Sequence, residues 1–174
     1  MSTVHSFAVH HGARFYENEE SLADIVADFL EPALTGGNPA IIAADRTQRG
    51  AILHALMDRS VEVGKLQHSG KLLLLDGDQT LSRFMIGGMP DRRRFAVTMS
   101  AAIARAQRGR QRDVRMYTQL IDMLWKQGML TAAVRLELFW NRLANARASV
   151  QCGYAMGPFY YDATLAEASR HAVA

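Results

Sequence analysis

A turn that carries three glutamates lies where nucleotide-binding α/β proteins place their phosphate-binding loop. The stretch ARFYENEESL (13–22) is typical of a strand end, a short turn and the start of an amphipathic helix. A phosphate loop needs glycines that expose backbone N–H groups and a lysine that neutralises the anion. This turn has neither, and Glu17, Glu19 and Glu20 would repel a triphosphate. Either these carboxylates stabilise the helix start, by about 0.3–1 kcal/mol each, or one of them faces a ligand.

Tyrosines and polar side chains follow several predicted strands at their carboxyl ends. Open α/β sheets bind ligands at this edge, and small-molecule pockets combine aromatic groups with a few polar ones. The predicted ligand-binding residues are Arg14, Tyr16, Glu17, Arg115, Tyr117, Gln119 and Tyr154. Four of them are expected to line one cavity: Tyr16, Tyr117, Gln119 and Tyr154. The alternative is that the tyrosines are core residues whose hydroxyls have partners in the protein.

The sequence contains no recognisable catalytic or metal-binding motif. It has no Ser/His/Asp pattern in a nucleophile context, no H-E-x-x-H and no Walker A motif. His5, His10 and His11 lack further ligands at metal-binding spacing. The single cysteine, Cys152, excludes an internal disulfide and is expected to be buried in a strand. We therefore predict no enzyme activity, no metal and no cofactor.

Arginine runs and an aromatic segment are candidates for partner surfaces. The runs DRRRF (91–95) and RAQRGRQRDVR (105–115) are either solvated or face an acidic partner. Direct nucleic-acid binding is disfavoured because no recognition module accompanies them. Trp125, Phe139 and Trp140 either pack in the core or form an exposed helix face for dimerisation or docking.

Hydrophobic periodicity predicts strands that alternate with helices. The predicted strands are 10–16, 40–44, 71–76, 114–119 and 149–156. The first helix is predicted over 19–35, with Pro32 kinking its last turn or ending it early. This alternation favours an α/β fold with a mostly parallel sheet flanked by helices. We predict one domain over residues 1–157 and a tail over 158–174.

The bulk composition is typical of a globular domain. Of the 174 residues 49% are hydrophobic, and the formal net charge is +3. No apolar run approaches the roughly 18 residues of a membrane span, and the N-terminus lacks the apolar region of a signal peptide. These features predict a soluble, cytoplasmic protein without a membrane segment.

Three segments together resemble the MEDS domain, named for methanogen and methylotroph sensory proteins and first described in the repressor of dichloromethane degradation. They are HHGARFYENEESL, GKLLLLDGDQTLSRFMIGGMPD, and VRMYTQLIDMLWKQGMLTAAVRLELFWNRL followed by QCGYAM. The resemblance implies a three-layer sensory domain related to the RecA/KaiC ATPase fold without its phosphate loop. Relatives occur alone, beside histidine kinases or beside DNA-binding domains. The family often has Gly-Glu where this chain has Thr118-Gln119, which puts a role that needs a charge there in doubt.

The expected function is a stand-alone sensory domain. It would bind a small neutral or apolar organic molecule and signal to a partner such as a histidine kinase or transcription regulator, and we expect a homodimer or docking onto that regulator. One alternative is a protein-interaction adaptor whose old nucleotide site is closed by Tyr16 and Tyr154. Another is a nucleotide-binding or enzymatic protein that uses a non-standard site.

Overall fold

The computed structural model describes residues 11–16, 19–110, 112–144 and 148–155. Within these ranges, some side chains lie outside the description. They are His11, Arg14, Phe15, Tyr16, Glu19, Glu20, Ala144 and Ala155.

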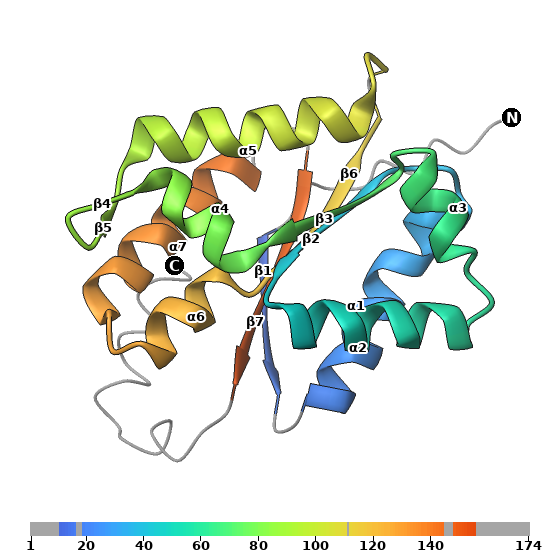
Figure 1. Cartoon of the computed structure of the whole chain (residues 1–174), viewed down its shortest axis with the longest axis horizontal. Helices are drawn as coiled ribbons and strands as arrows, with labels where there is room; N and C mark the ends of the chain where they lie inside the picture. The colour runs from blue at the N-terminus through green and yellow to red at the C-terminus, as the bar shows by residue number, and fades with distance from the viewer. Residues whose placement is uncertain (1–10, 17–18, 111, 145–147, 156–174) are drawn as a thin grey trace, which may run out of the picture.

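The centre of the molecule is a five-stranded sheet in the order β1-β7-β6-β2-β3 (Figure 1). The strands are β1 (His11–Tyr16), β7 (Ala148–Ala155), β6 (Val114–Thr118), β2 (Ala40–Ala44) and β3 (Leu72–Asp76). Every neighbouring pair is parallel. The predicted α/β fold with a parallel sheet is therefore confirmed.

Helices cover both faces of the sheet and complete three layers (Figure 1). One face carries α1 (Glu19–Thr35), α2 (Arg46–Asp58) and α3 (Val63–His68). The other carries α4 (Gly77–Phe84), α5 (Arg92–Gln107), α6 (Leu120–Lys126) and α7 (Leu130–Ala144). A short antiparallel pair, β4 (Met85–Ile86) and β5 (Met89–Pro90), joins α4 to α5. We refer to the two faces as the α1 face and the α7 face.

Alternation along each strand divides the side chains between two cores. Ile42 of β2 and Tyr117 of β6 belong to the α1-face core. Their neighbours Ile41 and Met116 belong to the α7-face core. The sheet is consequently apolar on both faces, as parallel sheets are when helices cover them.

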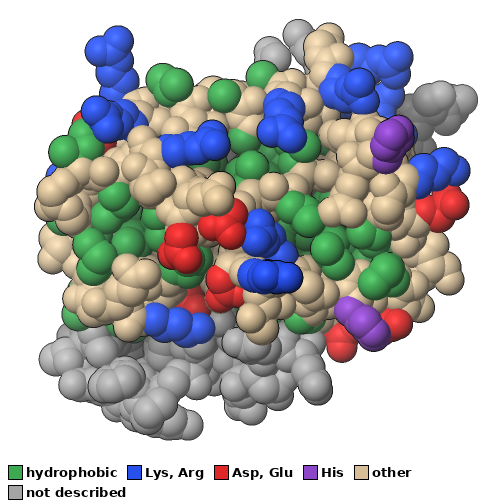
Figure 2. Space-filling model, viewed as in Figure 1, with side chains coloured by type: hydrophobic (Ala, Val, Ile, Leu, Met, Phe, Trp, Pro, Cys, Tyr) green, Lys and Arg blue, Asp and Glu red, His purple; other side chains and the backbone are tan. Residues whose placement is uncertain are grey.

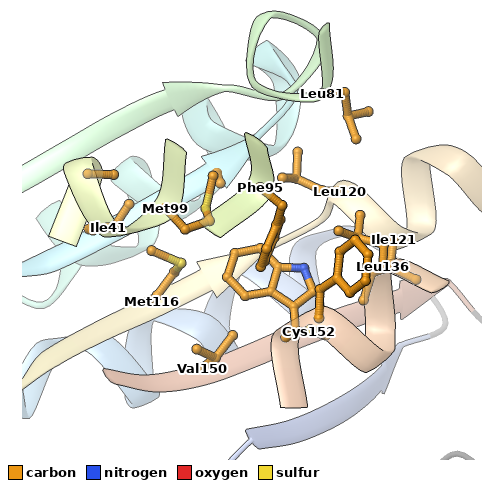
Figure 3. Close-up of a cluster of buried hydrophobic side chains, with 14 of the residues drawn as sticks. Ile41, Leu81, Phe95, Met99, Met116, Leu120, Ile121, Leu136, Val150 and Cys152 are labelled. Atoms are coloured by element: carbon orange, nitrogen blue, oxygen red, sulfur yellow. The ribbon is translucent and has the colours of Figure 1, made fainter. Parts of the chain in front are cut away.

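Aromatic rings dominate the α7-face core (Figure 3). Phe95 of α5 meets Trp140 of α7 edge to face, with ring centroids 4.9 Å apart, and contacts Phe84 in the same manner at 5.3 Å. Trp140 is fully buried and Phe139 nearly so. Core packing is thus confirmed for the Phe139 and Trp140 pair, and a docking role for these two rings is excluded by their burial.

One of the two outcomes predicted for Pro32, an early end of α1, is wrong. The helix continues through Pro32 to Thr35, and the proline is on its exposed side. Asp76 caps α4 by accepting a hydrogen bond from Gln79 N at 3.1 Å. Gly87 and Gly88 form the tip of the β4–β5 pair, where both adopt positive φ.

No helix among the described residues is long and apolar enough to cross a membrane.

Candidate functional site

The sheet has a topological switch point between β2 and β6. These strands are neighbours, yet α2 leaves β2 on the α1 face while α6 leaves β6 on the α7 face. The chain therefore diverges at their carboxyl ends. Such a point is where open α/β sheets usually bind their ligands.

Gln119 closes this switch point with two hydrogen bonds. Its backbone N–H donates to the Ala43 carbonyl at 2.9 Å, and its side-chain Oε1 accepts from the Asp45 N–H at 3.0 Å. Gln119 is 1% exposed. The Asp45 carboxylate in turn caps α2, accepting from Gln48 N at 2.8 Å. A neutral amide thus joins the ends of β2 and β6 to the first turn of α2.

The neighbouring end of β3 is held by an ion pair. Arg49 Nη2 lies 2.9 Å from Asp76 Oδ2 across the edge of the sheet. Acidic and basic side chains meet near the centre of Figure 2, over the start of α4. Gly77 follows Asp76 in close contact with α6, because a Cβ there would lie 2.5 Å from Met123 Sδ. A side chain at this position would therefore force Met123 of α6 to move.

The predicted cavity shared by the tyrosines is not formed by Tyr117 and Tyr154. Tyr117 is buried in the α1-face core, and its hydroxyl lies so close to Gly153 that a Cβ there would be 2.5 Å away. Tyr154 packs against the α7-face core. The register pairs Tyr117 with Gln151, so Tyr154, three residues further along, points to the opposite face. That expectation of one shared cavity is wrong for this pair.

On the α7 face, Tyr154 belongs to a small polar cluster. Its hydroxyl donates a hydrogen bond to Glu137 Oε2 of α7. Burial raises the pKa of the Cys152 thiol well above its ordinary value, Glu137 adds to the rise, and a hydrogen bond with Tyr154 opposes it. Cys152 is fully buried, as predicted, and this pKa keeps it a neutral thiol.

Arg115, the arginine of β6, contacts helix α1. Arg115 donates to the Phe29 carbonyl of α1 and lies over the Phe29 ring, 5.3 Å from its centroid. Burial lowers its pKa.

The remaining predicted site residues are at the start of the chain. Arg14 is paired with Gly153 and Tyr16 with Ala155 in β1, but their side chains and the whole of Glu17 lie outside the described residues. A ligand-binding role for the seven residues stays a prediction.

Two buried amides on the α1 face were missed by the sequence reasoning. Gln48 of α2 is 1% exposed, and neither atom of its amide has a hydrogen-bond partner among the residues that the structure describes. Gln151 of β7 is 4% exposed, and its Oε1 also lacks one. Gln151 points to the α1 face because Val150 and Cys152 on either side of it belong to the other core. Buried polar atoms without partners are rare, and each calls for an explanation.

A spacing signal could have identified Gln48. It precedes Ile52 and Leu56 at steps of four residues, which puts it on the buried stripe of α2.

The chemistry of this region is neutral. The buried polar side chains of the α1 face nearest the switch point are the amides of Gln48 and Gln151 and the phenol of Tyr117. Within the described ranges, no three His, Cys, Asp or Glu side chains are grouped closely enough to hold a metal ion. The arrangement can exchange hydrogen bonds with an uncharged ligand.

The comparison with protein families gives one match. The profile of the MEDS family, described as the methanogen/methylotroph DcmR sensory domain, matches residues 10–171. The comparison with curated proteins found no match. The family match passes the boundary predicted at residue 157, but residues from 156 onward lie outside the described part, so that boundary stays a prediction.

Proposed function

Since this chain belongs to the MEDS family of sensory domains, we propose that it detects a small uncharged organic molecule at the α1 face and passes the signal to a partner regulator. Family membership supports the sensory role. The observation that carries the ligand class is Gln48, a buried amide without a partner in the first turn of α2, next to the switch point. An amide offers both a donor and an acceptor. A ligand that pairs with both would offset the desolvation of that group.

A charged ligand fits this face poorly. Burying an ion is costly unless an opposite charge pairs with it. Arg115 is the cation of β6 on this face, and its guanidinium is already bound to the Phe29 carbonyl and ring. An uncharged molecule with hydrogen-bonding and apolar parts matches the neighbouring aliphatic core better.

Thermal shift with a panel of uncharged amides, alcohols, ketones and apolar compounds is the direct test. A ligand that binds only the folded protein at a concentration of 100 Kd stabilises it by about 2.7 kcal/mol. Gln48→Met keeps the side-chain volume but removes the amide, so this variant should lose the response. Gln67→Met, a change at an exposed glutamine of α3, should retain it. A panel without any stabilising compound, or equal responses in both variants, would refute the proposal.

We also propose that the carboxyl edge does not use ATP or GTP. The acidic, glycine-free turn after β1 supports this. Calorimetry with Mg-ATP should show no heat that saturates in the low micromolar range. Saturation there would favour the alternative of a non-standard nucleotide-binding protein.

A second candidate function, an interaction adaptor, is favoured by the closed switch point and by one helix face. Leu130, Val134 and Leu138 of α7 are 44%, 47% and 49% exposed, and steps of four residues put them in one stripe. The stripe suits docking of a second copy or of a regulator. If the chain is a sensor, this stripe is the surface through which the signal reaches a partner. If the chain is an adaptor, binding a partner through this stripe is its entire function.

Light scattering and pull-down address this surface. Val134→Glu with Leu138→Glu should dissociate a homodimer or abolish recovery of a regulator, because charges would replace apolar contacts. Arg142→Glu, an exposed change on the same helix, should have a smaller effect. A wild-type chain that is strictly monomeric and recovers no regulator would remove support for this output surface.

A further inference from the structure

A basic cleft lies at the amino edge of the sheet, opposite the switch point. Its volume is about 380 Å³, within the range of small-molecule pockets. It is formed where β2, β3 and β6 begin and where α5 ends. Its lining residues are Pro39, Ser69, Lys71, Ala106, Gln107, Arg108, Arg110 and Arg112.

The charge of this cleft is one-sided. Among the described lining residues, Lys71, Arg108, Arg110 and Arg112 are cationic and none carries a carboxylate. This local excess contrasts with the formal net charge of only +3 for the whole chain. Figure 2 shows Lys and Arg side chains gathered at the upper right of the view, over the loop that joins α5 to β6. A concave site with one sign of charge concentrates ions of the opposite sign.

Two of the arginines also have structural partners. Arg108 donates to the Ser69 carbonyl at the end of α3, and Arg112 donates to the Gly37 carbonyl after α1. Arg108 itself has a left-handed backbone, with φ 49°, and its guanidinium packs over Gly70, whose φ is 71°. These contacts fix the two arginines as walls of the cleft, and each guanidinium has further N–H donors.

Lys71 and Arg110, the other two cations of the cleft, have no such structural partners. Within the described ranges, the side chains of Lys71 and Arg110 form neither an ion pair nor a hydrogen bond. Helix C-termini at this edge carry partial negative charge and oppose anion binding, but Arg108 and Arg112 already neutralise two of the exposed carbonyls. Lys71 and Arg110 are therefore the cations available to a ligand.

We propose that this cleft binds a small phosphorylated molecule with more than one negative charge. Guanidinium groups match phosphate oxygens in a bidentate manner. Lys71 and Arg110 are two available cations, and Arg108 and Arg112 keep further N–H donors beside them, which matches a ligand with more than one negative charge. The volume of about 380 Å³ favours a small molecule over a nucleic-acid strand, which would need an extended groove. The cleft is independent of the ligand proposed for the α1 face and would make the domain responsive to a second, anionic signal.

Calorimetric titration of the full chain with inorganic pyrophosphate tests the proposal, at low salt and at about 0.15 M salt, where exposed charges are screened beyond roughly 8 Å. Lys71→Ala and Arg110→Ala should each weaken binding by about 3- to 10-fold, and the double variant by more. Inorganic phosphate should bind more weakly than pyrophosphate. The matched control is Arg92→Ala with Arg93→Ala, which removes two exposed arginines at the far end of α5 and should leave binding unchanged.

Thermal melts of all variants separate loss of binding from loss of folding. Absence of pyrophosphate binding by the wild-type chain would overturn the proposal. Equal weakening by the control would also overturn it, because binding would then follow total charge. Binding of a single-stranded oligonucleotide that depends on Lys71 and Arg110, without pyrophosphate binding, would instead identify a nucleic-acid surface. None of these results bears on the uncharged ligand, whose binding depends on Gln48.

Discussion

Replacing Gln48 by methionine should make the ligand-free protein more stable. The amide of Gln48 is 1% exposed and neither of its polar atoms has a partner. A buried polar group left without a hydrogen bond costs about 1–3 kcal/mol. Methionine fills nearly the same volume without that cost, and its flexible side chain adapts to an existing space.

The expected gain is therefore about 1–3 kcal/mol in the free energy of unfolding. For a domain of this size, each kcal/mol shifts Tm by about 2–4 °C, so we expect a rise of roughly 2–12 °C. Urea unfolding followed by circular dichroism gives the free energy, and differential scanning fluorimetry gives Tm. Gln67→Met changes the same residue type on the exposed side of α3 and should stay within about 0.5 kcal/mol of the wild type.

A fall in stability in Gln48→Met would refute this reasoning. It would mean that the amide is satisfied in solution, by ordered water or by residues outside the described ranges, and a ligand would then have to displace that partner. A rise in stability accompanied by loss of ligand response would show that the site maintains an unpaired polar group for binding, at a cost in stability.

Three further predictions follow from named contacts. Gln119→Met should lower the free energy of unfolding by about 1–3 kcal/mol in urea titration, because it leaves the Asp45 N–H without its acceptor. An unchanged urea midpoint would show that this hydrogen bond does not stabilise the fold. Gly153→Ala should destabilise the protein by about 1–3 kcal/mol, because the new Cβ would lie 2.5 Å from the Tyr117 hydroxyl. Adding Tyr117→Phe to this variant should recover part of the lost stability, and no recovery would show that the clash is not with the Tyr117 hydroxyl. Burial raises the pKa of Cys152 above its ordinary value of 9.0, so above about pH 9 only the unfolded state loses the thiol proton, and the free energy of unfolding should fall by up to about 1.4 kcal/mol per pH unit. Cys152→Ala should remove this fall from a plot of unfolding free energy against pH, and identical plots for variant and wild type would contradict the prediction.

The elements of the fold were predictable because their local patterns are strong. The apolar runs at 40–44 and 71–76 match β2 and β3 closely. Strand order was not predictable, because periodicity reports which side chains share a face and carries no information on which strands are neighbours. A continuous apolar run such as 71–76 is typical of a strand covered on both faces, whereas β3 is an edge strand and only half-buried at its carboxyl end.

The placement of the tyrosines shows the same limit. Alternation along β7 puts Gln151 and Tyr154 on opposite faces of the sheet. Which of these two residues shares a face with Tyr117 depends on the register between β6 and β7. The observed pairing of Tyr117 with Gln151 sends Tyr154 to the α7 face, and a shift of one residue would have reversed this outcome. Gln48 was missed for a different reason: hydrophobic periodicity selects apolar residues, so a polar residue on the buried stripe of a helix is overlooked.

A sensory role requires that ligand binding on the α1 face change something on the α7 face. Two hydrogen bonds supply a connection: Gln48 N donates to the Asp45 carboxylate, and the Asp45 N–H donates to Gln119 Oε1. Gln119 immediately precedes α6, and α6 leads to α7, which carries the exposed apolar stripe. A ligand shifts an equilibrium only through differential affinity for two states, so a movement of α2 on binding must strain or relax this connection. We therefore expect Gln119→Met to retain the thermal-shift response to an uncharged ligand while the effect of that ligand on partner binding is lost. If the variant keeps both, the signal leaves by another route; if it loses both, Gln119 belongs to the binding site itself.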